Sequence, residues 1–500
     1  MHSRPALGAL MAGLVAGSLA ACAVGPNFKR PTPPTAPGYG SAPVQGQTAA
    51  AAVAAAADGA GGAAQTFVAG MDIPSQWWTL FKSPALDQLV EQALKGNPDV
   101  DAAKAALRQA HELYAAQRTS FFPLVQGEFS GLRAKNALGT LANPTSLPQV
   151  NPYYNLYTAQ LSVSYLPDVF GATRRQVEIA KAQEENNRFQ LEAVYLTLSS
   201  NVVVTAIQEA SLRGQVDATT RLLQLQHQLT DTVQHQRTLG TASDLDVLAQ
   251  QSAEAQTAQS LPPLQKQLGQ TRDALTALLG RLPSEEPTQT FHLDQLTLPT
   301  ELPVSLPSKL VEQRPDVRQA EENMHAASAA VGVAIADMLP QFAISGNIGS
   351  SSLAIGQLFG PYTGFWDAGA SLTQTLFDAG ALLHKKRAAD AALDQAAAQY
   401  RAAVILACQN VADSLRALQS DADALKASAE AERAAKLTFD LAQRQRELGT
   451  ISWVAVLNAE QSYRTAQLAL VQAQANRYSD TAGLFQSLGG GWWNRPGEGK

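Results

Sequence analysis

An internal duplication constrains the fold of this 500-residue chain more than any other feature. Asn97-Pro98-Asp99-Val100 returns later in the chain as Arg314-Pro315-Asp316-Val317, and Phe122-Pro123 returns at the same spacing as Leu339-Pro340. Matches that keep one order indicate two copies of a single structural unit. We therefore expect a first repeat over 71–290, a second repeat over 291–488 and a C-terminal tail over 489–500.

Each repeat has the same predicted order of elements, namely a helix, two strands, a long helix and a shorter helix. The first helices, opened by Pro84 and Ser308, are expected over about 85–120 and 308–338. The remaining predictions are strands at about 124–133, 156–166, 341–349 and 367–377, long helices at about 172–238 and 381–447, and last helices at about 243–280 and 452–487.

The four predicted strands alternate apolar and polar residues. Val125 and Phe129 interleave with Gln126 and Glu128, whereas the fourth strand is less regular because Gln374 falls in its apolar row. A transmembrane barrel strand has this pattern, with apolar side chains toward lipid, but a half-buried soluble sheet has it too. Aromatic residues near the predicted loops favour a membrane interface: Tyr153, Tyr154, Tyr157, Phe359, Tyr362, Phe365 and Trp366.

Four strands cannot close a barrel, since transmembrane barrels need at least about eight. A membrane interpretation therefore requires several copies, and a trimer would supply twelve strands. The long helices, each of about 66 residues, would measure roughly 100 Å. Their apolar residues recur at coiled-coil spacing, and the remaining faces are polar with little charge, as a water-filled lumen would need. In the first copy this seam is Leu191, Tyr195, Leu198, Val202, Leu212, Val216, Leu223 and Val233.

The N-terminal sequence predicts a secretory signal peptide over 1–21, because it has a short charged start followed by an apolar run. It ends in Leu19-Ala20-Ala21-Cys22, which resembles a bacterial lipobox, so we expect a lipid on Cys22. Ala23 rather than Asp follows the cysteine, as in signals for the outer membrane. Residues 22–70 are rich in Ala, Gly and Pro and are predicted to be a flexible tether.

Composition and motifs exclude several classes of function. The formal net charge is −6 with no basic patch, so nucleic-acid binding has no support. The seven histidines are dispersed, and no HExxH, GxSxG or Walker A motif occurs. We therefore expect neither an enzyme nor a metal site, and no cofactor apart from the lipid on Cys22.

Taken together, these residues resemble the outer-membrane efflux protein family, the TolC-like channels, and within it the NodT-type lipoprotein branch that serves resistance-nodulation-division pumps. Cys22-Ala23-Val24-Gly25-Pro26-Asn27-Phe28, Trp77-Trp78-Thr79-Leu80-Phe81 and Leu239-Gly240-Thr241-Ala242-Ser243-Asp244 carry the resemblance. It implies a homotrimer with a twelve-strand β-barrel in the outer membrane and a periplasmic twelve-helix α-barrel. It also implies an equatorial belt, expected over 281–307 with the two chain ends.

The resemblance implies a passive exit duct, lipid-anchored in the outer membrane of a Gram-negative cell, that works with a periplasmic adaptor and an inner-membrane pump. The expected adaptor contacts are two turns at the helix ends: Leu239, Gly240, Thr241 and Ser243, and Leu448, Gly449, Thr450 and Ser452. Asp231 and Asp440 each precede a turn glycine by the same spacing, so we expect them to form a periplasmic gate, unless they face solvent or pair with Arg237 or Arg446.

Three alternatives remain open at this stage. A periplasmic coiled-coil lipoprotein without a barrel would explain the helices but not the duplicated strands. A lipid-anchored enzyme would need a catalytic constellation, which the motifs do not supply. An outer-membrane component of type I protein secretion would share the fold, although such relatives usually lack the lipobox. The sequence does not name the transported substrates.

Overall fold

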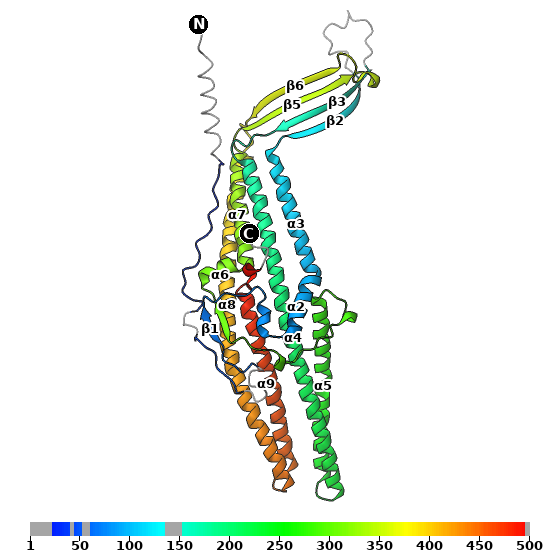
Figure 1. The fold of residues 1–500 in the computed structure, drawn as a ribbon, viewed down its shortest axis with the longest axis vertical. Helices are drawn as coiled ribbons and strands as arrows, with labels where there is room; N and C mark the ends of the chain where they lie inside the picture. The colour runs from blue at the N-terminus through cyan, green and yellow to red at the C-terminus, as the bar shows by residue number, and fades with distance from the viewer. Residues whose placement is uncertain (1–22, 41–44, 53–60, 136–152, 496–500) are drawn as a thin grey trace, which may run out of the picture. The chain divides into compact units, whose positions relative to one another are not determined.

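The computed structural model describes residues 23–40, 45–52, 61–135 and 153–495 (Figure 1). The signal peptide predicted over 1–21 and the lipidation predicted at Cys22 lie outside these ranges. The chain divides into two compact units. We call them the sheet unit (Met1–Arg30, Arg108–Glu185 and Glu321–Gln399) and the helical unit (Pro31–Leu107, Asn186–Ala320 and Tyr400–Lys500). Each unit draws on both sequence repeats, so a repeat is not itself a compact body.

The sheet unit contains one antiparallel four-stranded sheet in the order β2-β3-β5-β6 (Figure 1). Its strands are β2 (Leu124–Lys135), β3 (Tyr153–Tyr165), β5 (Gln341–Ser352) and β6 (Gly364–Thr373). The two strands of one repeat therefore lie beside the two strands of the other. Among the described strands, β2 pairs only with β3 and β6 only with β5, so the sheet has two edges with unpaired backbone groups.

The register separates an apolar face from a polar face. Leu161 lies opposite Gly127 on one side and opposite Ile348 on the other, and these residues share the apolar face. On the polar face, the Gln160 amide donates to Glu128 (3.0 Å) and the Asn347 amide donates to Asp367 (3.0 Å). The apolar face is solvent-exposed in the single chain, with large exposed side chains at Val125, Phe129, Leu161, Val163, Ile344, Ile348, Trp366 and Leu372.

The predicted position of the fourth strand needs correction. It was expected over 367–377, but β6 ends at Thr373 because its partner β5 begins at Gln341, directly opposite. Gln374 therefore lies beyond the strand and does not interrupt its apolar row. Its side-chain amide donates to the backbone carbonyls of Met338 (3.2 Å) and Thr375 (3.1 Å).

The first helix of each repeat is broken, and the prediction of a continuous helix was wrong. The chain forms α2 (Pro84–Gly96) and α3 (Pro98–Arg118), then α6 (Pro307–Gln313) and α7 (Pro315–Ala336). Asn97 and Arg314, the residues between the helices, are extended, with ψ values of 126° and 119°. Each precedes a proline, whose ring excludes the helical conformation from the residue before it.

The two long helices are α4 (Ala172–Thr238) and α8 (Ala381–Glu447), and each has 67 residues. Each turns back into a shorter helix, α5 (Asp244–Leu278) or α9 (Trp453–Ser487). Leu191, Leu198, Val202, Leu212 and Val233 of the predicted seam are buried. Tyr195, Val216 and Leu223 are only half-buried, whereas Val203, Ile207 and Leu222 are buried as well. The buried stripe is therefore wider than a strict coiled-coil seam.

An aromatic core lies in the helical unit. Trp77 and Phe81 belong to a short 3-10 helix, Trp77–Phe81, and both are buried. The Trp77 ring stacks on Phe485 of α9 with centroids 5.4 Å apart, and Phe81 lies 6.3 Å from Tyr478. The Tyr478 hydroxyl donates to the Leu296 carbonyl (2.8 Å), which ties α9 to the predicted belt.

The belt segment 281–307 contains β4 (Glu301–Val304), which pairs in parallel with β1 (Thr66–Ala69) from the N-terminal part of the chain. Phe291, Leu296, Leu298 and Leu302 of the belt are buried. Pairing with β1 means that the belt is assembled from both the middle and the N-terminal region, as expected from the resemblance.

The described parts of segment 22–70 are packed, so the prediction of a flexible tether was wrong for them. Arg477 of α9, which is fully buried, donates to the Thr48 hydroxyl (2.9 Å) and the Ala63 carbonyl (2.6 Å). The Tyr39 hydroxyl donates to the Ser305 carbonyl (2.7 Å). The composition suggested a linker, but these hydrogen bonds come from residues far away in sequence.

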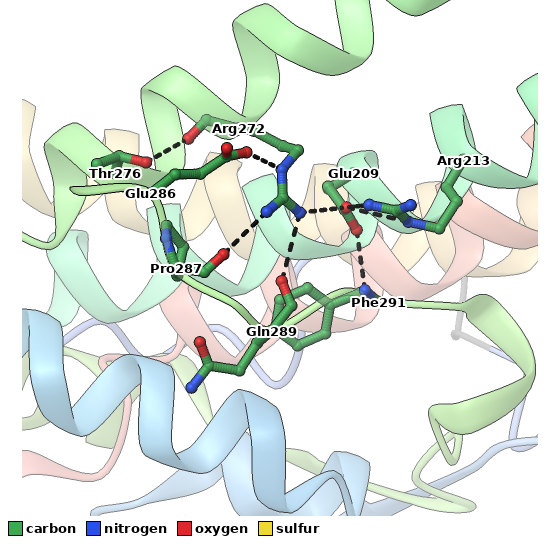
Figure 2. Close-up of polar contacts among 8 residues, drawn as sticks. All are labelled: Glu209, Arg213, Arg272, Thr276, Glu286, Pro287, Gln289 and Phe291. Atoms are coloured by element: carbon green, nitrogen blue, oxygen red, sulfur yellow. Dashed lines mark hydrogen bonds and ion pairs between the residues drawn. The ribbon is translucent and has the colours of Figure 1, made fainter. Parts of the chain in front are cut away.

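A buried carboxylate fixes the belt to the long helices (Figure 2). Glu209 of α4 is fully buried and pairs with Arg213 and with Arg272 of α5, the latter at 3.0 Å. The backbone N–H of Phe291 donates to the other oxygen of Glu209 (3.0 Å). Arg272 also pairs with Glu286 and donates to the Pro287 carbonyl (2.9 Å). Such charge-assisted bonds hold belt residues 286–291 in one position on α4 and α5.

Candidate functional site: the helix-end turns

The turn between α4 and α5 is built from a left-handed glycine. Gly240 has φ +73°, which side chains disfavour, and its N–H donates to the Arg237 carbonyl (2.9 Å). The Thr241 N–H reaches back to the Gln236 carbonyl (2.9 Å). This pair of bonds is a Schellman motif, which satisfies carbonyls at the end of α4 and reverses the chain sharply.

The turn between α8 and α9 repeats this geometry. Gly449 has φ +74° and donates to the Arg446 carbonyl (2.8 Å), while the Thr450 N–H donates to the Gln445 carbonyl (3.0 Å). Leu239 and Leu448, one residue before each glycine, are 66% and 79% exposed. The structure thus presents the two predicted turns as equivalent, rigid loops with outward leucines.

The two turns differ in how the next helix begins. Ser243 caps α5 by accepting from the Asp246 N–H (3.2 Å), and the Asp246 carboxylate accepts from the Ser243 N–H (3.0 Å). Ser452 accepts from the Ala455 N–H (3.4 Å), but Ala455 cannot return the bond. The first turn therefore has a full capping box, and the second has half of one.

Apolar packing joins the two hairpins behind the turns. A cluster combines residues of α4, α5, α8 and α9, namely Val233, Val247, Phe439, Ala442, Trp453, Val456 and Ala459. The Trp453 indole N–H donates across to the Gln236 side chain (3.3 Å), and the Arg446 guanidinium lies over the Trp453 ring at 5.0 Å. A cleft of about 410 Å³ beside this contact is lined by Gln236, Thr241, Arg446, Gly449 and Trp453, among others.

The two predicted gate residues are not equivalent in the single chain. Asp231 is exposed, whereas Asp440 is half-buried. The pKa of Tyr463 on α9 is raised chiefly by burial, then by the charge of Glu432, and in smaller part by the charge of Asp440. The arginines that could have neutralised them are engaged elsewhere. Arg237 pairs with Asp244, and Arg446 donates to the Ile451 carbonyl (3.2 Å). Within the described ranges, no ion pair holds Asp231 or Asp440.

Glu460 of α9 is a buried carboxyl group that the sequence reading missed. It is 1% exposed, and neither of its side-chain oxygens has a hydrogen-bond partner among the described residues. Burial raises its pKa from 4.5 to about 7, opposed by the amide of Gln226 and the charge of Arg464. In the sequence it stands between Ala459 and Gln461, where it looks like one more polar residue of an amphipathic helix.

The part of the chain that the structure describes offers little other chemistry. No group of three or more His, Cys, Asp or Glu side chains there could hold a metal ion. His227 pairs with Glu254 at 3.0 Å instead. No helix within the described ranges is long and apolar enough to cross a bilayer.

Comparison with known proteins decides the family. The profile described as "Outer membrane efflux protein" matches residues 89–281 and 306–490, which is most of both repeats. The chain belongs to this family. Its members are channels of efflux systems, so this efflux protein is an outer-membrane channel and not an enzyme.

Individual relatives agree over nearly the full length. The efflux protein is 28% identical over 486 residues to the probable efflux pump outer membrane protein TtgC of Pseudomonas putida, covering 96% of this chain and 95% of TtgC. It is 29% identical over 423 residues to the pyoverdine export outer membrane protein OpmQ of the same species, covering 84% and 89% of the two chains.

Among solved structures, the outer-membrane channel OprN has a TM-score of 0.81 and 28% identity, and the match covers 94% of this chain and all of OprN. The fold class predicted from the sequence is therefore confirmed: the efflux protein has the helical-barrel and β-barrel fold of these channels. The coiled-coil lipoprotein and enzyme alternatives are excluded by the same match. The turn residues and the two aspartates remain predictions about function.

Proposed function

We propose that three copies of this efflux protein close one continuous duct, with twelve strands in the outer membrane and twelve helices below them. The two unpaired edges of the β2-β3-β5-β6 sheet carry this proposal. Four strands are too few for a barrel, and open edges must be paired in a lipid environment. The exposed apolar face would then contact lipid, and the face with Glu128 and Asp367 would line the lumen.

The helix-end turns are the proposed docking site for a periplasmic adaptor. Leu239 and Leu448 are exposed apolar side chains on loops that the Schellman bonds hold rigid, which suits contact with a partner's helical hairpin. Through the adaptor the duct would receive cargo from an inner-membrane pump of the resistance-nodulation-division type. Conduction would be passive, with no cofactor beyond a lipid.

Bulky substitutions at the turns test the docking proposal. Thr241→Trp and Thr450→Trp should abolish efflux in cells while leaving the oligomer and the purified channel's conductance unchanged. Thr465→Trp, on α9 away from the turns and also exposed, is a matched control that should retain efflux. Normal efflux in both turn variants would refute docking at the turns.

The lipid anchor is proposed at Cys22, since the lipobox ends there and the chain belongs to an outer-membrane family. Cys22→Ser should lose acyl labelling while part of the protein still reaches the outer membrane, because the barrel is an anchor of its own. Labelling that persists in this variant would refute lipidation at Cys22.

Asp231 and Asp440 are proposed to narrow the periplasmic end. Three copies would bring six carboxylates to one level, and crowded carboxylates favour cations. The double variant Asp231→Ala, Asp440→Ala should raise the closed-state conductance and weaken cation selectivity in single-channel recordings. Values equal to those of the wild type would remove these residues from the gate. The cargo is proposed to be small organic molecules, because the relatives include a toluene efflux pump outer membrane protein and a pyoverdine export outer membrane protein.

A further inference from the structure

The first described residues of the chain pack against α4, α7 and the turn between β3 and α4 in the sheet unit. The Val24 N–H donates to the carbonyl of Phe170, in the turn that joins β3 to α4 (3.0 Å). Arg175 of α4 is only 4% exposed and donates to the carbonyls of Val24 (3.3 Å) and Gly25 (3.4 Å). It also donates to the Asn27 side chain (2.7 Å). One buried guanidinium thus holds three positions of the segment, Val24, Gly25 and Asn27.

Glycines on both sides of the contact make this close approach possible. Gly25 has φ +91°, and a Cβ at this position would lie 2.4 Å from the Cα of Gly332 on α7. Gly171 has φ +84°, and a Cβ there would lie 2.6 Å from the Cα of Ala23. Any larger residue at either position would push the segment away from α7 or from the β3–α4 turn. The close contact therefore depends on glycine at both positions.

A histidine closes the far end of the segment. The Phe28 ring stacks on the His325 imidazole with centroids 4.3 Å apart. His325 Nε2 lies 2.9 Å from Glu178 of α4, and Nδ1 lies 3.2 Å from Glu322 of α7. Only the imidazolium can donate to both carboxylates at once. Two more ion pairs flank it, Arg175 with Glu178 (2.7 Å) and Arg30 with Glu321 (2.6 Å).

We propose that residues 23–30 form a clasp, closed by His325 in its charged form, that holds the N-terminal anchor point of the chain against the turn between β3 and α4. Ala23 packs on Gly171, so the described part of the chain begins beside the turn at the end of the sheet. If Cys22 carries a lipid, as proposed above, the clasp delivers the acyl chains to that end of the barrel. The clasp itself does not depend on the lipid.

The charge of His325 gives the clasp a pH dependence with a definite sign. Hydrogen bonds that His325 donates to Glu322 and Glu178 raise its pKa above 6.5, against the opposing effect of burial. A histidine whose pKa is raised in the closed state stabilises that state below pH 6.5. The stabilisation disappears as the pH rises through the raised pKa. The clasp should be firm in mild acid and looser in alkali.

Hydrogen–deuterium exchange of the full-length protein, corrected for the intrinsic effect of pH, measures the clasp directly. At pH 6, His325→Gln should speed amide exchange of residues 24–30 severalfold. Each unit by which the pKa of His325 is raised contributes a factor of about ten. Wild-type exchange should approach that of the variant at pH 9. His111→Gln is the matched control, since His111 pairs with Glu184 of α4 (2.7 Å) in the same unit but is largely exposed.

Three results would overturn the proposal. These are equal exchange in wild type and His325→Gln at pH 6, protection of residues 24–30 that does not change with pH, and an equal loss of protection in His111→Gln. Glu322→Gln, which keeps the imidazole and removes one carboxylate, should give an intermediate loss. Repeating the measurement in Cys22→Ser separates the two proposals: protection that persists shows a clasp without a lipid, and protection that vanishes shows that the lipid, not the clasp, holds the segment.

Discussion

Glu460→Gln should stabilise the helical unit in alkali and change little in acid. The side chain is 1% exposed and unpartnered within the described residues, and burial raises its pKa from 4.5 to about 7. In the unfolded chain the carboxyl group ionises near its ordinary pKa. Between these values the folded state must keep a proton that the unfolded state has released, so stability falls as the pH rises.

The size of the effect follows from the same two pKa values. A rise from 4.5 to about 7 corresponds to roughly 3 kcal/mol of destabilisation once the pH exceeds 7. A glutamine has nearly the same shape and carries no charge, so it should recover most of this energy at pH 8.5. At pH 4 both side chains are neutral, and the difference should be within about 1 kcal/mol.

The free energy of local opening of α9 around Trp453–Arg464, obtained from hydrogen exchange, is the quantity to measure. Wild type and Glu460→Gln are compared at pH 4 and at pH 8.5. Glu447→Gln serves as the control, because Glu447 is an exposed acid at the end of α8. Equal opening energies for wild type and Glu460→Gln at pH 8.5 would refute the reasoning, since an ionised Glu460 would then have found a partner or water.

Further predictions concern the turns and the belt. Gly240→Ala and Gly449→Ala should each lower the local stability of their turn by about 1 kcal/mol, measured as faster hydrogen exchange there. The cause is the positive φ alone, because an added Cβ would meet no residue beyond its chain neighbours within 4 Å. Ser243→Ala should destabilise the start of α5 by about 1 kcal/mol, and Ser452→Ala should destabilise the start of α9 by less. Only the α5 cap is reciprocal, with Asp246 returning a hydrogen bond to the Ser243 backbone. Glu209→Ala should cost about 3–5 kcal/mol in denaturant unfolding, since it leaves Arg272 and the Phe291 N–H without their buried acceptor.

Much of the architecture could be predicted from local patterns. The alternating strands and the long helices depend on periodicities of two and about 3.6 residues, which the sequence displays directly. The breaks at Asn97 and Arg314 were also visible, because a proline follows each, but the apolar spacing on either side suggested one helix. The turns at Gly240 and Gly449 could be located from the repeated Leu-Gly-Thr together with the Val-Leu pair that follows each glycine at the same spacing.

The remainder depends on contacts between residues that are far apart in sequence. The sequence around Thr48 and Ala63 does not indicate that the buried Arg477 binds them, so the composition of their segment predicted a linker. Glu209 and Glu460 looked like ordinary surface acids of long helices. Only the packed structure shows that one has two guanidinium partners and that the other has no partner in the described part of the chain.

The central claim is that three copies of the sheet join edge to edge into one barrel. Cysteines placed on the two edge strands test it, in a Cys408→Ser background. One cysteine replaces Gln126 or Glu128 in β2, and the other replaces Asp367 or Gly369 in β6. Within one chain these strands are three strand spacings apart, about 14 Å, which is too far for a disulfide. A bond can therefore form only between copies.

The measurement is the size distribution of covalent species after oxidation of the double-cysteine protein in its membrane, resolved on a denaturing gel. The account predicts that at least one of the four pairings gives a ladder of monomer, dimer and trimer that stops at three, whereas each single-cysteine control gives no trimer. Monomer alone in all four pairings, or a ladder that continues beyond three, would contradict a closed barrel of three copies.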